Sequence, residues 1–360
     1  YAETFDSGRS ALLFSLKAAG IGEGDEVLLQ AYTCVVVVNA IEWTGALPIY
    51  ADIKADFTMD PSDCEKKITP KTKAIIIQHT FGNPSDMEKL LALSKKYSLF
   101  VIEDCAHSLG GTANGALTGT MGDVGMFSFG SDKVVSCVRG GAVITRRKDI
   151  AERLSAFHGQ LPAMPMLFLL RHLAHFPIFL IGKALYPYGI GKLLLLIAKK
   201  LRCTSRIIEE SEKHGKQTLG YPTQLPNALA EILLEELAHL KEKNAATQAV
   251  ASEYRKLLKD MPLPELSPDC VYLRFPLLVE HPERMRRAAK KEGILLGDWY
   301  ATVIAPADIE MAKMQYNEGS CPVAESAASR SVNLPTQGPL TEHDINQVAK
   351  AVRLAMKPYA

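Results

Sequence analysis

A short apolar run that ends in two adjacent carboxylates constrains the fold of this 360-residue chain more than any other feature. The run covers residues 98–102, and Glu103 and Asp104 follow it directly. A continuous apolar run of this length, bounded by polar residues, is typical of a buried strand. Open α/β sheets bind their ligands at the carboxyl ends of such strands. The run therefore predicts a sheet with polar chemistry at one edge.

The segments around this run alternate between strand and helix patterns. Strands are expected at 26–30, 47–51, 73–78, 124–129 and 142–145, with helices at 11–19, 35–44 and 87–97. Such alternation is typical of a parallel sheet covered by helices, so an α/β fold is expected. We expect a large domain over 1–218. A smaller C-terminal α+β domain over 219–360 should contain a long helix at 228–261, strands at 271–279 and 293–297, and helices at 282–292 and 341–356.

Asp104 and Lys133 follow two different predicted strands and form a chemical pair. A lysine acts as a nucleophile only without its proton, a state that burial and neighbouring charge can favour. Pyridoxal phosphate (PLP) needs such an amine for a Schiff base, and a carboxylate that keeps its pyridine nitrogen protonated. Ser128 offers a nearby hydroxyl to a phosphate oxygen. Singly, each residue is more often a surface or turn residue, but together they favour a cofactor site.

A helix start near the N-terminus is a second candidate phosphate site. Gly8, Arg9 and Ser10 precede an apolar helix that ends at Gly20. Free N–H groups at a helix N-terminus bind phosphate, and a glycine lets the backbone approach the ligand. The alternative is an ordinary capped helix.

The order and spacing of the central motifs resemble the DegT/DnrJ/EryC1/StrS family. The motifs are EDCAHS at 103–108, Gly122-Asp123, Phe127-Ser128-Phe129 with Lys133 four residues on, and Gly140-Gly141. That family consists of fold-type-I PLP enzymes, mostly nucleotide-sugar aminotransferases. The resemblance implies a large domain with a mainly parallel seven-stranded sheet between helices, and a smaller C-terminal α+β domain.

The resemblance also implies residue roles. Lys133 would bind the cofactor covalently and Asp104 would pair with its pyridine nitrogen, so these two are the predicted catalytic residues. His107 would lie beside the ring, and the phosphate would be held by Gly8, Arg9, Ser10 and Ser128. The substrate mouth would include His79, Trp299 and Tyr300.

Three positions depart from the family pattern. Cys34 stands where the family often stacks an aromatic ring on the cofactor, so Tyr32 or His107 would cover that face. Pro222 replaces an Asn that reaches the cofactor phosphate across the family's dimer, and Asn227 is the candidate substitute. Arg139 stands where the family usually has Glu.

The resemblance implies a homodimeric aminotransferase that moves an amino group from glutamate or glutamine to a nucleotide-linked keto sugar, for cell-surface polysaccharide or glycoconjugate biosynthesis. Three alternatives stay open. One is a PLP-dependent sugar dehydratase, although such relatives have His in place of Lys133. The others are an aminotransferase that acts on a lipid-linked acceptor and a non-catalytic scaffold with the PLP fold.

Charge and cysteine content exclude other classes. A net charge of +1 gives no argument for nucleic-acid binding. Seven widely spaced cysteines without a CxxC pair argue against disulfides and zinc, so no metal is expected and the cytoplasm is the expected compartment. The first residues lack the basic start and apolar run of a signal peptide.

An apolar and basic insert at about 161–206 has no usual counterpart in the family. It has no acidic residue, since none lies between Glu152 and Glu209, and its cations are Arg171, Lys183, Lys192, Lys199, Lys200, Arg202 and Arg206. A membrane-spanning helix needs about 20 consecutive apolar residues, and here charged residues, histidines and prolines interrupt the run. Basic apolar helices in a membrane interface fit better, which would place the protein at the inner face of the cytoplasmic membrane. Packing onto the protein itself or onto a second subunit is the alternative.

Overall fold

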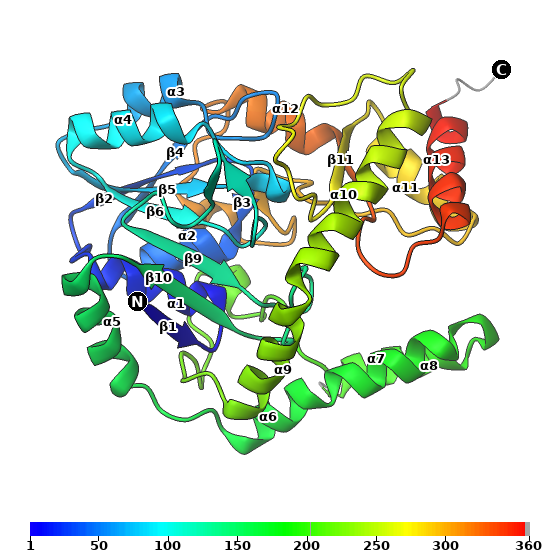
Figure 1. The fold of residues 1–360 in the computed structure, drawn as a ribbon, viewed down its shortest axis with the longest axis horizontal. Helices are drawn as coiled ribbons and strands as arrows, with labels where there is room; N and C mark the ends of the chain where they lie inside the picture. Colours follow the sequence, from blue (N-terminus) through cyan, green and yellow to red (C-terminus); the bar gives the residue numbers. More distant parts are fainter. Residues whose placement is uncertain (202, 357–360) are drawn as a thin grey trace.

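The computed structural model describes residues 1–201 and 203–356, apart from the side chain of residue 187. Arg202, one of the cations expected in the insert, therefore lies outside the described residues. A seven-stranded sheet forms the core of the larger part of the molecule, on the left in Figure 1. Its spatial order is β1 (Ala2–Phe5), β10 (Gly141–Thr145), β9 (Val124–Ser128), β6 (Phe100–Asp104), β5 (Thr72–Gln78), β2 (Glu26–Gln30) and β4 (Leu47–Ala51).

The sheet is mainly parallel, as expected. The strands β9, β6, β5, β2 and β4 run parallel, whereas β10 and β1 close one edge in antiparallel pairs. The register pairs Gln78 with Asp104 and Asp104 with Met126, so the carboxyl ends of three strands meet. The N-terminal strand β1 was missing from the sequence expectation, because its four residues carry little periodic signal.

Helices cover both faces of the sheet because its strands are apolar on both sides. Ile76 and Ile102 pack toward α1 (Gly8–Ala18), α2 (Val35–Glu42) and α5 (Lys148–Gly159). Ile75 and Ile77 point to the other face and pack toward α3 (Pro61–Lys67) and α4 (Met87–Tyr97). This alternation along β5 follows from the two-residue period of a strand.

The C-terminal part has a core of its own around the short antiparallel pair of β11 (Phe275–Leu278) and β13 (Ser331–Leu334). The core is closed by α10 (Leu240–Leu257), α11 (Pro282–Lys291) and α13 (Glu342–Met356), while α12 (Pro322–Arg330) packs in the core of the large sheet. Thr341 and Asp344 cap α13 reciprocally, with N–H to oxygen distances of 2.8 and 3.2 Å. The division at residue 218 stays a prediction.

In this C-terminal part, two elements of the structure differ from those expected from the sequence. The helix expected at 228–261 is two helices, α9 (Asn227–Ala238) and α10, because the chain leaves helical geometry at His239. The strand expected at 293–297 is absent, and only Gly297 forms an isolated bridge, with Asn333. Short pairs join distant segments: β12 (Ile304–Ala305) runs parallel to β3 (Thr33–Cys34), and β7 (Thr112–Ala113) pairs with β8 (Ala116–Leu117).

The apolar insert forms helices, the last two of which project from the body (Figure 1). They are α6 (Met166–Leu173), α7 (His175–Ala184) and α8 (Ile190–Lys200), with a 3-10 turn at Tyr186–Tyr188 between the last two. By length and composition, one helical stretch of the described residues, Met166–Ala184, could cross a membrane, and 11% of it is buried.

Candidate active site

A cavity of about 290 Å³ opens at the carboxyl ends of the central strands. It is bounded by the end of β6, the end of β9, the start of α1 and the loop after β9. Two segments far away in sequence complete the wall. The first is 206–208, and the second contributes residues 298–301 and 305–307. Of the predicted site residues, the cavity wall includes Gly8, Arg9, Cys34, Asp104, His107, Ser128, Lys133, Trp299 and Tyr300.

Asp104 is the last residue of β6, and its carboxyl group is buried in the cavity floor. One of its oxygens, Oδ1, accepts a hydrogen bond from the Ala106 N–H at 3.0 Å. Burial raises the pKa of Asp104, while that N–H group and the charge of Lys133 act in the opposite direction. A buried carboxylate of this kind favours a cationic partner in the cavity.

Lys133 lies in the loop after β9, with 13% of its side chain exposed. Its Nζ is 3.1 Å from Oδ2 of Asp132 and 5.1 Å from the ring centre of Trp299. The other oxygen of Asp132 is buried and has no hydrogen-bond partner among the described residues. Sequence reasoning missed Asp132, although its position next to Lys133 was a usable signal.

The start of α1 approaches β9 closely. A Cβ atom on Gly8 would lie 2.7 Å from Cβ of Ser128, so this position requires glycine. The cavity therefore has a helix N-terminus and a hydroxyl side by side. Arg9 forms an ion pair with Glu212 and donates to the Ile207 carbonyl oxygen, which ties the segment after the insert to this helix start.

Aromatic rings line the opposite side of the cavity. His107 stacks on Trp299 with 5.4 Å between ring centres, and its Nε2 is 3.4 Å from the Tyr300 hydroxyl. The Phe81 N–H donates to Nδ1 of His107 at 3.2 Å, so Nδ1 is an acceptor. Burial, with the charges of Lys133 and Arg274, holds the pKa of His107 well below its usual value. His107 is therefore neutral near pH 7.

Four predicted site residues lie outside the cavity wall. Tyr32 is fully buried behind Tyr300, stacks on Phe57 and bonds to the Ser331 hydroxyl at 2.8 Å, so it does not present its ring to the cavity. Burial raises the pKa of Tyr32 to about 12. Asn227 is exposed at the first residue of α9, and the cavity wall does not include it.

Ser10 and His79 are the other two. The Ser10 hydroxyl donates to Asp6 at 2.7 Å and is thereby engaged in the protein interior. His79 is buried with its Nε2 3.3 Å from Glu103, and the Ser85 N–H donates to its Nδ1 at 3.1 Å. Glu103 also accepts backbone hydrogen bonds from residues 119, 121 and 122, so His79 and Glu103 stabilise the loop after β6.

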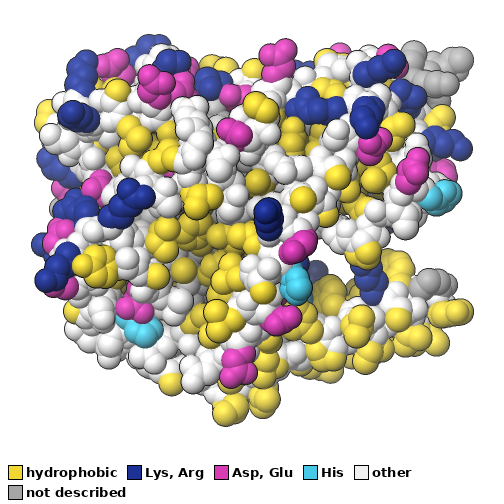
Figure 2. All heavy atoms as spheres, in the orientation of Figure 1, with side chains coloured by type: hydrophobic (Ala, Val, Ile, Leu, Met, Phe, Trp, Pro, Cys, Tyr) yellow, Lys and Arg dark blue, Asp and Glu magenta, His cyan; other side chains and the backbone are white. Residues whose placement is uncertain are grey.

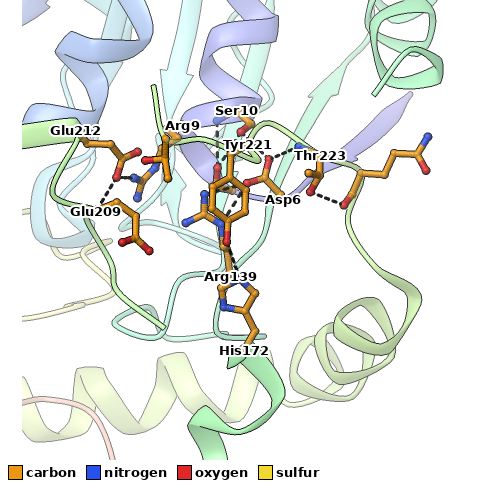
Figure 3. Close-up of polar contacts among 12 residues, drawn as sticks. Asp6, Arg9, Ser10, Arg139, His172, Glu209, Glu212, Tyr221 and Thr223 are labelled. Atoms are coloured by element: carbon orange, nitrogen blue, oxygen red, sulfur yellow. Dashed lines mark hydrogen bonds and ion pairs between the residues drawn. The ribbon is translucent and has the colours of Figure 1, made fainter. Parts of the chain in front are cut away.

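Arg139 occupies the centre of a buried network beside the cavity (Figure 3). Its guanidinium donates twice to Oδ2 of Asp6, at 3.2 and 3.0 Å, and lies 3.7 Å from the ring centre of Tyr221. The Tyr221 hydroxyl is 3.0 Å from Nε2 of His172, at the end of α6. The departure from the family's Glu therefore has a physical reason, since Arg139 neutralises the carboxylate of Asp6, which is 0% exposed.

These residues fit PLP. The cavity contains the buried carboxyl group of Asp104 for the pyridine nitrogen and the amine of Lys133. For the phosphate it contains a helix N-terminus at Gly8, where there is no room for a side chain. Its volume is at the lower end of the range for ligand pockets, about 300–1,000 Å³. It therefore suits a cofactor and the reacting part of a substrate, whereas a larger substrate must extend through the mouth.

The chain matches the family model described as the DegT/DnrJ/EryC1/StrS aminotransferase family over residues 1–163 and 194–353. It is 30% identical over 357 residues to dTDP-3-amino-3,4,6-trideoxy-alpha-D-glucose transaminase of Streptomyces venezuelae, with 97% of this chain and 81% of that protein covered. A stretch of 161 residues, 44% of this chain and 44% of the relative, is 45% identical to GDP-perosamine synthase of Escherichia coli O157:H7.

Among solved structures, S. venezuelae DesV in complex with a ketimine intermediate has a TM-score of 0.76 at 29% identity, covering 99% of this chain and 85% of that chain. This likeness confirms the expected fold, that of fold-type-I PLP enzymes. The family match omits residues 164–193, which are most of the projecting insert.

Proposed function

The chain belongs to the DegT/DnrJ/EryC1/StrS aminotransferase family and is a PLP-dependent transaminase, and on this premise we propose its reaction. The enzyme transfers the amino group of glutamate or glutamine to the keto carbon of a nucleotide-linked sugar. The observation that carries the proposal is the presence of Lys133 and Asp104 in one cavity, with a helix N-terminus beside them. The retained lysine supports amino transfer over sugar dehydration.

PLP, when bound, supplies an electron sink that lets an amino group pass from one carbon to another. Lys133 holds the cofactor, and its Nζ moves the proton at the donor carbon and later at the acceptor carbon. Asp132, whose Oδ2 is 3.1 Å from that Nζ, forms an ion pair with the lysine and orients its amine. Asp104 keeps the pyridine nitrogen protonated, because a buried carboxylate is stabilised by an adjacent positive charge.

Other residues of the cavity position the ligands. Gly8 and Arg9 at the start of α1, with the Ser128 hydroxyl, bind the cofactor phosphate. His107 is neutral and its ring is stacked on Trp299, so the two form a flat wall beside the cofactor ring that adds no positive charge. Arg206 lines the wall and offers a cation to the carboxylate of the donor or to the diphosphate of the acceptor.

The nucleotide-linked acceptor is supported by the functions of the relatives. One relative is a dTDP-amino-sugar transaminase and another is a GDP-perosamine synthase. A third is the UDP-N-acetyl-3-dehydro-alpha-D-glucosamine 3-aminotransferase of Acidithiobacillus ferrooxidans. It is 29% identical over 355 residues, with 96% of this chain and 82% of that protein covered. Their nucleotides and sugars differ, whereas all three names describe amino sugars linked to a nucleotide. We further propose a cytoplasmic homodimer that serves polysaccharide or glycoconjugate synthesis. A lipid-linked acceptor is the second candidate, because Arg206, at the end of the apolar insert, lines the cavity.

An absorbance spectrum with PLP tests the proposal. Wild-type protein should develop visible absorbance that Lys133→Ala lacks, and glutamate should bleach it as the amino group moves to the cofactor. Lys71→Ala, at an exposed position, is the matched control and should behave as wild type. Incubating the aminated enzyme with GDP-, UDP- and dTDP-linked keto sugars then identifies the acceptor. A spectrum that is identical for wild type and Lys133→Ala would refute the assignment of the lysine.

A further inference from the structure

The insert forms a compact helical hairpin. The helices α7 and α8 pack side by side, and glycines at their contact allow the close approach. A Cβ atom on Gly191 would overlap the Gly182 carbonyl oxygen, and one on Gly182 would lie 2.7 Å from a methyl group of Leu195. Glycine at both positions therefore indicates that the hairpin is a built element of the fold.

The outer surface of the hairpin is apolar. Figure 2 shows hydrophobic side chains along the projecting arm. Leu180 is 74% exposed, Tyr188 75% and Leu193 58%. The other exposed large apolar residues of 175–201 are Phe176, Phe179, Ile181, Tyr186, Ile190, Leu196, Ile197 and Leu201. A contiguous patch of this kind is typical of a protein or membrane interaction site.

The charges of the hairpin have one sign. Lys183, Lys192, Lys199 and Lys200 are exposed, and residues 153–208 contain no Asp or Glu. The whole chain is nearly balanced, with 41 basic and 40 acidic residues. The positive charge is therefore local and complements an anionic surface. Two hairpins from two copies of the chain would instead bring like charges together.

The hairpin is too short to span a bilayer. The helix α7 has 10 residues and α8 has 11, so each is about 15–17 Å long, against a hydrocarbon thickness of about 30 Å. The longer stretch Met166–Ala184 is held to the body through α6. There Arg171 donates to the Thr204 carbonyl at 2.8 Å and to Glu209 at 3.1 Å, and His172 contacts Tyr221.

We propose that the α7–α8 hairpin binds the surface of an anionic lipid bilayer and lies in its interface. The lysines lie at both ends of the hairpin, with Lys183 and Lys192 near the turn and the other two near the end of α8. An arrangement along the surface therefore lets all four reach the headgroups. The apolar side chains then enter the boundary of the acyl chains. This binding concerns a surface remote from the amino-transfer chemistry and does not depend on the proposed substrate.

Vesicle flotation tests the proposal. The holoenzyme should float with vesicles of phosphatidylcholine and phosphatidylglycerol, bind pure phosphatidylcholine vesicles much less, and dissociate as salt rises. Replacing Lys183, Lys192, Lys199 and Lys200 by Gln should lower the partition coefficient by about fivefold per lysine. The matched control replaces four exposed lysines far along the sequence, at positions 241, 259, 290 and 291, and should leave flotation unchanged.

A second variant tests the apolar surface. Leu180→Ser with Leu193→Ser alters side chains that are already exposed, so folding should be retained, which circular dichroism checks. Flotation should fall while the reaction with glutamate is unchanged. Equal binding of wild type to neutral and anionic vesicles would overturn the electrostatic part. Absence of flotation, or a dimer that this variant converts to a monomer without lipid, would overturn the membrane assignment. Neither result bears on catalysis, which the absorbance assay measures separately.

Discussion

Replacing Arg139 by Met tests the account of the buried network. Asp6 is fully buried and keeps two hydrogen bonds in the variant, from the Ser10 hydroxyl and the Thr223 N–H at 3.1 Å. The Asp6 carboxylate, however, loses the guanidinium that balances its charge and donates two hydrogen bonds to it. Removing one partner of a buried ion pair costs about 3–5 kcal/mol of stability. The lost contact with the Tyr221 ring places Arg139→Met in the upper half of that range.

A double-mutant cycle separates the pair from its surroundings. Asp6→Asn retains an oxygen for Ser10 and Thr223 but leaves Arg139 as an unpaired buried cation, so it should also lose about 3 kcal/mol. The double variant should lose about as much as one single variant, which corresponds to a coupling of about 3 kcal/mol. Arg139→Glu, which carries the usual family residue, should be less stable than Arg139→Met because it buries a second carboxylate beside Asp6.

Urea unfolding of the cofactor-free protein, followed by circular dichroism, measures these differences. The control is Arg147→Met, which removes a half-exposed cation that pairs with Asp123 and Asp149 and should cost no more than about 1 kcal/mol. If the losses of Asp6→Asn and Arg139→Met add within about 0.5 kcal/mol, the two residues are not coupled and the explanation of Arg139 is wrong.

Three further substitutions test the buried groups and the hairpin. Asp104→Asn should stabilise the cofactor-free protein near pH 7 in thermal unfolding, because burial raises the pKa of this carboxyl and penalises its charge. The same variant should slow the reaction with glutamate by about 100-fold or more in stopped-flow absorbance. Unchanged stability together with an unchanged rate would contradict this role of Asp104. Burial lowers the pKa of His172 to about 3, so from pH 6.5 down to 3 the unfolded chain binds a proton that the folded chain does not, and stability falls. His172→Gln should flatten that dependence by about 1.4 kcal/mol per pH unit in urea unfolding, and an unchanged slope would exclude His172 as the cause. Gly191→Ala should separate α7 from α8 at a cost of about 1–3 kcal/mol and speed amide exchange in 175–200, whereas Gly159→Ala, with open space around it, should not.

The central motif could be predicted from sequence because its chemistry is local. Asp104 ends a strand, Lys133 follows the next, and parallel strands bring their carboxyl ends to one edge of a sheet. The partners of Arg139 could not be predicted in this way. Asp6 lies 133 positions away, and nothing in the intervening sequence shows which carboxylate the arginine meets.

Side-chain direction explains the other differences. Tyr32 is two positions before Cys34 and Ser10 directly follows Arg9, and both Cys34 and Arg9 line the cavity. The side chains of Tyr32 and Ser10 nevertheless point into the interior, where they bond to Ser331 and Asp6. Proximity in sequence cannot distinguish these directions. The helix break at His239 was missed for a different reason, since the segment 228–261 has no proline or glycine that would mark a break.

The segment Arg206–Ile208 connects two parts of the molecule. It follows the helical hairpin in the chain, and it forms part of the cavity wall. Arg9 at the proposed phosphate site bonds to the backbone of Ile207. A ligand that orders this segment, whether lipid at the hairpin or cofactor in the cavity, reduces the conformational entropy that the segment still loses when the other ligand binds. Such coupling is reciprocal by thermodynamic necessity. By whatever factor lipid tightens cofactor binding, the cofactor tightens lipid binding, so the partition coefficients of the loaded and the empty enzyme onto vesicles would differ by that same factor.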